Sequence, residues 1–256
     1  MAAAYTTIDV VADRRLRGLV TITLNRPRKL NAIDYVMHGE LQRACAALND
    51  DANARVVIIA GAGRAFSSGN DLKPRRRPRA SSDLERRRRV EDGNRTSAAI
   101  EALPQVTIAA INGLSVGGAV VLAACVDIRL AAASAWFSIP EIDLELPLTW
   151  NALPRLMREL GPARTKELVM TGRRFTAAEA HAWGFVNHVY PDGRLIEEAR
   201  ALAATLLAKD PLTLATTKAA TRALAQLMVP EQATYSDPEL LLLADAMARR
   251  RRQGEG

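Results

Sequence analysis

The sequence has little of what stabilises small secreted domains or binds metal ions. Its 256 residues include only two cysteines, Cys45 and Cys125, and neither belongs to a CxxC pair. Both lie in alanine-rich, helix-like surroundings, so we expect buried core residues rather than disulfide partners or nucleophiles. The three histidines have no ligand-like spacing with cysteine or carboxylate side chains. A metal site is therefore not expected.

Long hydrophobic runs are also missing. No apolar run reaches the roughly 18 residues that a membrane-spanning helix needs. Residues 1–15 lack the charged segment and apolar core of a secretion signal. We therefore expect no membrane contact and a cytoplasmic location. Hydrophobic residues make up 48% of the chain and charged residues 25%, which is typical of a globular protein with a substantial core.

Aromatic residues are scarce, at 4%, and this affects how the basic charge is interpreted. The net charge of +7 comes mostly from arginines gathered at 75–79, 86–89 and 249–252. Such clusters attract polyanions, either nucleic acid or the phosphates of a coenzyme, unless they are simply solvated segments. No aromatic side chain is interleaved with the arginines, so nucleic-acid binding is not expected. The sequence assigns these clusters no role.

Alternating strand and helix patterns fill the first 190 residues. The alternation of Val20, Ile22 and Leu24 marks a strand with one buried face, and Asp34 is a suitable helix N-cap. Strands are predicted at 6–11, 18–25, 54–60, 106–111, about 126–132, 136–140 and 184–190, and helices at about 34–49, up to 103–104 and at 119–124.

The pattern changes after residue 150. With one short strand excepted, the chain from residue 151 onward is helical in pattern, and helices are predicted at about 195–209, 212–228 and 238–250. Their apolar stripes exceed what one small core needs to bury. We therefore divide the chain into a core at 1–190 and a C-terminal helical region at 191–256 that is used in subunit packing.

Two glycine-bearing segments each follow a strand-like apolar run. RAFSSGNDL (64–72) follows ARVVIIA, and NGLSVGGA (112–119) follows VTIAAI and leads into a helix pattern. The unpaired backbone N–H groups at a helix start can hold an anionic oxygen. The sequence therefore points to a two-part anion site built from backbone groups.

These segments belong to an ordered set of motifs that resembles the enoyl-CoA hydratase/isomerase family, also called the crotonase family. The other members of the set are RPRKLNAI (26–33), CVDIRLA (125–131), FSIPEIDL (137–144) and TGRRFTAAEAHAWGFVNHV (171–189). The resemblance implies an α/β fold, a crotonase-like spiral of ββα repeats with a C-terminal helical region. It also implies assembly into homotrimers or dimers of trimers.

The same resemblance implies the substrate, a coenzyme A thioester, with no cofactor bound permanently. The backbone N–H groups of Asn70 and Gly118 would form an oxyanion hole for the thioester carbonyl. Gly117 would permit close approach of the acyl chain. Further coenzyme A and substrate contacts are expected at these positions: Arg28, Lys29, Ala32, Ser68, Asp71, Leu72, Lys73 and Trp150.

The acid/base residues depart from the pattern of the family's hydratases, which use two glutamates to activate one water. The second glutamate is present as Glu141, but the first falls on Val121, which cannot transfer a proton. Glu145 and Asp143 are candidates for a second acid/base group, or else are ordinary loop charges. A single carboxylate facing an enolate suits double-bond isomerisation, with Glu141 moving the proton.

Three alternatives stay open. The chain can be an enoyl-CoA hydratase that pairs Glu141 with Glu145 or with water. It can be a non-catalytic protein of the same fold that binds acyl-CoA or RNA. Finally, Gly113 to Gly117 spells GxSxG around Ser115, the nucleophile motif of α/β-hydrolases, with Asp143 and either His181 or His188 in the order of a catalytic triad. The acyl chain and the pathway are not determined by the sequence.

Overall fold

The computed structural model describes residues 5–72, 82, 85, 88–89 and 91–230. Lys73, most of the arginine clusters and the helix predicted at 238–250 lie outside the described residues.

A six-stranded sheet forms the centre of the molecule, in the order β1-β2-β3-β5-β7-β10. β1 and β2 pair in antiparallel fashion, and the other neighbours pair in parallel. β3 and β5 are almost completely buried, as expected for parallel strands covered on both faces. The strands are β1 (Ile8–Ala12), β2 (Leu19–Leu24), β3 (Val56–Gly61), β5 (Val106–Ile111), β7 (Ile128–Ala132) and β10 (His188–Tyr190).

A second sheet of four short strands has the order β4-β6-β8-β9. Its strands are β4 (Ala65–Ser67), β6 (Leu114–Val116), β8 (Trp136–Ser138) and β9 (Phe175–Thr176). β3, β5 and β7 of the large sheet are each followed along the chain by a strand of the small sheet. The chain therefore advances as a spiral that gives one strand to each sheet per turn, which confirms the predicted ββα repeats.

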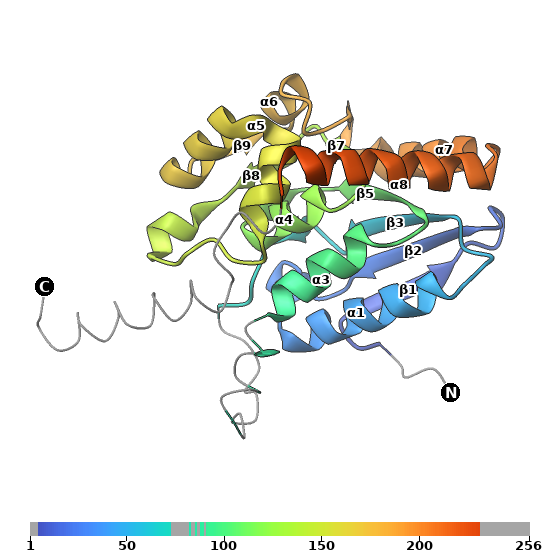
Figure 1. The fold of residues 1–256 in the computed structure, drawn as a ribbon, viewed down its shortest axis with the longest axis horizontal. Helices are drawn as coiled ribbons and strands as arrows, with labels where there is room; N and C mark the ends of the chain where they lie inside the picture. Colours follow the sequence, from blue (N-terminus) through green and yellow to red (C-terminus); the bar gives the residue numbers. More distant parts are fainter. Residues whose placement is uncertain (1–4, 73–81, 83–84, 86–87, 90, 231–256) are drawn as a thin grey trace, which may run out of the picture.

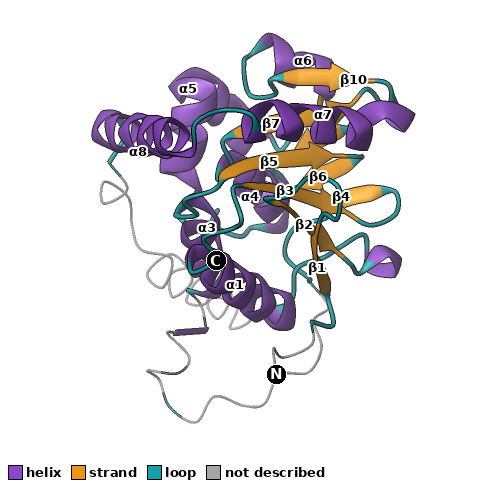
Figure 2. Ribbon diagram, turned by 90° about the vertical axis from the view of Figure 1, so that its right-hand side faces the viewer, coloured by secondary structure: helices purple, strands orange, loops and turns teal. Residues whose placement is uncertain are grey.

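Helices return the chain between these strand pairs. Figure 1 shows α1 lying beside α3, and Figure 2 shows α7 packed against β5 and β7. Asp34 caps α1 by accepting hydrogen bonds from the backbone N–H groups of Val36 and Met37, as predicted. The helices are α1 (Tyr35–Asn49), α3 (Asp92–Glu101), α4 (Gly118–Ala124), α5 (Ala152–Thr171), α6 (Ala177–Ala182), α7 (Leu195–Leu207) and α8 (Pro211–Met228), with short 3-10 helices η1 (Pro27–Lys29), η2 (Pro140–Leu144) and η3 (Asp192–Arg194).

The two C-terminal helices differ in how they meet the core. α7 buries Leu195, Ala199 and Ala203 against the large sheet. α8 has no buried residue, and it exposes Leu212, Leu224, Leu227 and Met228. Among the described residues, no helix combines the length and apolar character that crossing a membrane requires. α8 is therefore an amphipathic surface helix whose apolar side chains have no cover within the described chain.

Both cysteines are free and buried, as the sequence predicted. Cys45 lies on α1, and Cys125 follows α4 and places its Sγ 3.2 Å from the carbonyl oxygen of Val121. Burial raises the pKa of each thiol to about 12, so neither is a thiolate at neutral pH.

Candidate active site

A single parallel bridge orients the backbone of Asn70. The N–H of Ile33 donates to the carbonyl of Gly69 at 2.8 Å, and the N–H of Asp71 donates to the carbonyl of Ile33 at 3.0 Å. In a parallel bridge, the residues on either side of the paired one make both hydrogen bonds. The N–H of Asn70 consequently donates to no described residue and is available to a ligand.

The second free donor is at the start of α4. The N–H of Gly117 donates to the carbonyl of Ser138 at 2.8 Å, whereas the N–H of Gly118 has no acceptor among the described residues. The first N–H groups of any helix lack an intrahelical partner. Gly69, beside Asn70, packs closely here: a Cβ on it would lie 3.1 Å from the nitrogen of Gly118. The two free N–H groups therefore belong to backbone segments in direct contact.

Asn31 fixes one of these segments from behind. Its backbone is left-handed, with φ of 54°, and the residue is completely buried. Its side-chain amide donates to the carbonyls of Ala62 and Ala65, each at 2.9 Å, and of Phe66 at 3.2 Å. The RPRKLNAI segment is thereby held against the strand that leads to Asn70.

Arg26 strengthens the same connection by electrostatics. Its guanidinium lies 2.9 Å from Asp71 and 3.3 Å from Asp34, and it also donates to the carbonyl of Ala32. Arg26 and Asn31 belong to the RPRKLNAI motif, but their residue types and positions in the sequence predict no particular role. No local signal could have found them, because their partners are up to 45 residues away in sequence.

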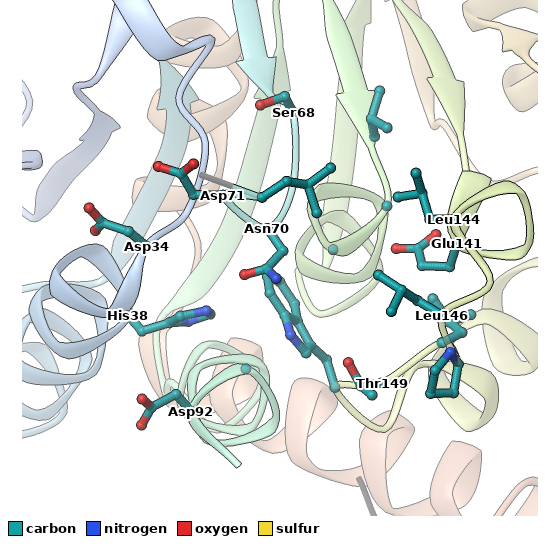
Figure 3. A pocket seen from close by; sticks show the side chains of 18 of the residues that line it. Asp34, His38, Ser68, Asn70, Asp71, Asp92, Glu141, Leu144, Leu146 and Thr149 are labelled. Carbon is teal, nitrogen blue, oxygen red and sulfur yellow. The ribbon is translucent and has the colours of Figure 1, made fainter. Parts of the chain in front are cut away.

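A cavity of about 400 Å³ opens beside the two free N–H groups. Figure 3 shows Ser68 and Asp71 on one side of it, Glu141, Leu144 and Leu146 on another, and Thr149 opposite Ser68. The structure brings eight of the predicted site residues to this cavity: Ser68, Asn70, Asp71, Leu72, Gly117, Gly118, Glu141 and Trp150.

Glu141, on η2, places its carboxylate beside Gly117, the N-cap residue of α4. A Cβ on Gly117 would lie 2.5 Å from its Oε1, and the φ of 55° at Gly117 is a backbone conformation that favours glycine. The Oε2 atom is buried without a hydrogen-bond partner among the described residues. Burial raises the pKa of Glu141 above its ordinary value of 4.5.

Three other carboxylates line the cavity, and each is ion-paired. Asp34 and Asp71 share the guanidinium of Arg26, and Asp92 pairs with Arg95 on α3. Glu141 therefore differs from the other described carboxylates of the cavity, because it combines burial, an unpartnered oxygen and proximity to the free N–H groups.

Several predicted residues lie elsewhere. Arg28 and Lys29 are exposed on η1, and Ala32, three residues after η1, is buried. Asp143 faces the end of α5, since a Cβ on Gly172 would lie 2.8 Å from its Oδ2. Glu145, just after η2, is exposed and does not line the cavity.

Val121 lies one turn into α4 and is completely buried in the hydrophobic core. It does not line the cavity, and its neighbours on the helix are valine, leucine and alanine. No carboxylate therefore reaches the cavity from α4, where the family's hydratases place their first glutamate.

The hydrolase alternative finds no support in the geometry. Ser115 lies within β6, completely buried, and its Oγ has no hydrogen-bond partner among the described residues. The Nδ1 of His181 lies 3.0 Å from the carbonyl of Val186, and His188 lies on the edge strand β10. A nucleophilic serine requires a hydrogen-bonded base, and neither histidine supplies one here.

The lower end of the cavity contains residues that the sequence analysis gave no site role. His38 on α1 and Gly93 on α3 both line it. The Nδ1 of His38 lies 2.9 Å from the Oγ1 of Thr96, and its ring meets the ring of Trp150 edge-on, with centroids 4.9 Å apart. Nothing in the local sequence marks His38 or Gly93, because both stand in ordinary helix patterns.

Comparisons with known proteins agree on one family. The family model described as Enoyl-CoA hydratase/isomerase matches residues 14–255. YngF of Bacillus subtilis, which carries the name enoyl-CoA hydratase/isomerase, is 38% identical to this chain over 195 residues. These residues are 76% of this chain and 74% of YngF. The peroxisomal Delta(3,5)-Delta(2,4)-dienoyl-CoA isomerase of Arabidopsis thaliana is 32% identical over 84% of this chain and 81% of its own.

Solved structures agree with the sequence relatives. An enoyl-CoA hydratase/isomerase from Xanthobacter autotrophicus Py2 superimposes with a TM-score of 0.85 at 32% identity, over 98% of this chain and 95% of that one. The match spans both sheets and the C-terminal helices, so the similarity is not confined to short motifs. The chain belongs to the enoyl-CoA hydratase/isomerase (crotonase) family of acyl-CoA enzymes.

Proposed function

We propose that this enzyme moves the double bond of an enoyl-CoA thioester from the 3 to the 2 position, with Glu141 as its acid/base. The supporting observation is the buried, unpartnered Oε2 of Glu141 beside the free N–H groups of Asn70 and Gly118. These two donors form the oxyanion hole for the thioester oxygen. Removing one such donor in a hydrolase costs about 3 to 4 kcal/mol, which sets the scale of the contribution.

The reaction needs one carboxylate and no net change of atoms. Glu141 removes a proton from carbon 2 of the 3-enoyl thioester, and the electron pair moves onto the thioester oxygen. The N–H groups of Asn70 and Gly118 hold this enolate. Glu141 then returns the proton to carbon 4, and the double bond forms between carbons 2 and 3. No permanently bound cofactor is required.

The environment of Glu141 suits this proton transfer. A carbon acid gives up its proton most readily to a base whose pKa is raised, and burial raises the pKa of Glu141. The carboxylates of Asp34, Asp71 and Asp92 are each engaged in an ion pair with an arginine, so their oxygens are less available to take up a substrate proton. Among the described carboxylates, we therefore assign Glu141 the catalytic role.

Hydration is the less favoured reaction, because a second carboxylate is needed to activate the water. Val121 supplies none from α4, and Asp143 and Glu145 lie outside the cavity.

Coenzyme A would enter past η1 and the segment after β4. Arg28 and Lys29 are exposed there, where their charges can attract phosphates, and Ser68 and Asp71 line the cavity itself. We place Lys73 in the same group from its position in the sequence. Because exposed contacts of this kind are screened by salt, substrate binding should weaken as ionic strength rises. A cytoplasmic acyl-CoA pool would be the source of the substrate.

We further propose that residues 1–190 form the catalytic core and 191–256 the packing region of a homotrimer or a dimer of trimers. The supporting observation is α8, whose exposed apolar side chains include Leu224 and Leu227. Light scattering should give a mass of three or six chains. Leu224→Glu together with Leu227→Glu should lower that mass, whereas Leu212→Glu at the other end of α8 should have a smaller effect. A monomeric parent protein would contradict the assembly.

Assays with 2-enoyl-CoA and 3-enoyl-CoA esters test the reaction. The parent protein should isomerise 3-enoyl-CoA, and Glu141→Gln should lose roughly 10²- to 10⁴-fold in kcat, the usual contribution of a general acid/base. Glu145→Gln should retain near-parental activity, since that side chain lies outside the cavity. Rapid hydration of 2-enoyl-CoA that survives Glu141→Gln would overturn the assignment, and an equal loss in Glu145→Gln would favour the hydratase that uses both glutamates.

A further inference from the structure

The side chain of Trp150 forms part of the cavity wall. Only 7% of the residue is exposed, although it lines the cavity. Its ring lies between two helices, against Gly93 of α3 and Gly118 of α4. The indole ring is therefore packed between α3 and α4 and is not a surface side chain.

Glycine is needed on both sides of this ring. A Cβ on Gly93 would lie 2.0 Å from Cδ1 and Nε1 of the indole, and a Cβ on Gly118 would lie 2.4 Å from Cη2 and Cζ3. Any larger residue would push the ring out of its position. The five-membered part of the indole therefore fits against α3 and the six-membered part against the oxyanion glycine.

The backbone around Trp150 also restricts the position of the ring. Trp150 has φ of 65° and Asn151 has φ of 48°, which are unusual for residues other than glycine. The guanidinium of Arg155, 1% exposed, donates to both of their carbonyls at 3.0 Å. The ring of His38 meets the indole edge-on from the other side. Together these contacts leave the indole little freedom to move aside.

In the proposed binding mode, the acyl chain of the thioester points toward the ring of Trp150. Under the proposed function the thioester oxygen lies at Gly118 and coenzyme A contacts Ser68, so the acyl chain is directed toward the opposite side of the cavity. Figure 3 shows Thr149, the neighbour of Trp150, on the side of the cavity opposite Ser68. Because the indole touches Gly118 itself, only a few carbons fit between the thioester and the ring.

We propose that Trp150 is the residue that limits this enzyme to short acyl chains. The inference rests on the proposed function, because it takes Gly118 as the thioester site. An apolar wall discriminates by size, and each methylene that fits or fails to fit changes kcat/KM by roughly tenfold or more. The ring thus excludes acyl chains that would have to pass between α3 and α4.

The test compares 3-enoyl-CoA esters with four, six and ten carbons in the acyl chain. The parent enzyme should prefer the four-carbon ester, and Trp150→Ala should raise the ratio of kcat/KM for the ten-carbon to the four-carbon ester by roughly tenfold or more. Trp150→Phe, which keeps a smaller ring, should give an intermediate ratio. Trp136→Ala, which removes a tryptophan outside the cavity, should leave the ratio unchanged.

Two results would overturn the inference while leaving the proposed function intact. One is a parent enzyme that isomerises ten- and four-carbon esters equally well, which would mean that the chain leaves past the partly exposed Leu144 and Leu146. The other is an active Trp150→Ala variant with the parental ratio. If no ester is isomerised by the parent enzyme, the proposed function itself fails.

A fluorescence measurement covers the case in which Trp150→Ala does not fold. The double variant Trp136→Phe and Trp183→Phe leaves Trp150 as the one tryptophan, since the chain has three. Saturated butanoyl-CoA should change its emission, and coenzyme A alone should change it much less. Emission that stays constant while butanoyl-CoA binding is seen by calorimetry would contradict contact between the acyl group and the ring.

Discussion

At the scale of single residues, the site depends on one carboxylate whose surroundings oppose its charge. The Oε1 of Glu141 faces the backbone of Gly117, and its Oε2 is buried without a described hydrogen-bond partner. Such an arrangement costs stability whenever the group ionises, because no partner replaces the lost water. The proposed catalytic role accounts for a carboxylate in such surroundings, whereas a contribution to folding does not.

This cost predicts a pH-dependent gain in stability for Glu141→Gln. Because burial raises the pKa of Glu141 in the folded state, the folded protein keeps a proton that the unfolded chain releases above about pH 4.5. The resulting stability is fully present below that pH and is lost as pH rises through the folded-state pKa. Thermal unfolding should therefore show that Glu141→Gln becomes more stable relative to the parent protein as pH rises from 4.5 to neutral. The activity of the variant should be lower than that of the parent.

The control for this prediction is Glu197→Gln, which alters an exposed carboxylate on α7. It should give no comparable gain. A Glu141→Gln variant that is less stable than the parent at neutral pH would show that the carboxylate makes a stabilising contact.

At the scale of elements, two connections made by Arg26 and Asn31 position the loop that carries Asn70. Asn31 joins the segment after β2 to the loop between β3 and β4 and to β4 itself, and Arg26 joins the same segment to Asp71. β4 and β6 contain only three residues each, too few to fix the loop by strand pairing alone. Side-chain hydrogen bonds to backbone carbonyls compensate for the short strands.

Asn31→Ala should therefore cost about 2 to 4 kcal/mol in the free energy of unfolding, because three backbone carbonyls lose their donor. Urea denaturation measures this cost. Asn31→Gly adopts the left-handed backbone without strain, yet it should still show most of this loss in the free energy of unfolding. Asn49→Ala, an exposed asparagine at the end of α1, should change the free energy by less than about 0.5 kcal/mol. A cost near zero for Asn31→Ala would contradict the connection.

At the scale of the whole molecule, the two sheets and the helices between them enclose one large core. Cys45 on α1 and Cys125 after α4 belong to that core, although 80 positions separate them in the sequence. Since both thiols are buried with a pKa of about 12, burial in the same core protects both of them from ionisation and from alkylation.

Alkylation of these cysteines should accordingly report global unfolding. At about pH 8, iodoacetamide should modify neither thiol of the native protein, because both access and the thiolate are lacking. In denaturant both should react, and the transition should coincide with that seen by circular dichroism. Above about pH 9, the ordinary pKa of a free thiol, stability should fall as pH rises toward 12, since the unfolded chain then releases protons that the folded core retains. Rapid labelling of native Cys125 would contradict this description of the core.

The order of elements was predictable because it depends on local chemistry. The buried strands and the glycine-led α4 follow from apolar periodicity, and the N-cap of α1 follows from Asp34. The short strands β4 and β6 were not predicted, because three residues carry no period. The family and its backbone donors followed from motifs, since free N–H groups at Asn70 and Gly118 do not depend on side chains.

What the sequence by itself determined was the fold class, the family and the absence of a carboxylate at Val121, because each is written in residue type and order. Only the tertiary structure decided which carboxylates face the cavity. Glu141 and Asp143 are two residues apart, yet one faces Gly117 and the other faces Gly172. It also decided that Trp150 lies against Gly93 and Gly118. Such contacts join residues far apart in the chain, and they exist only after packing has fixed the distances between elements.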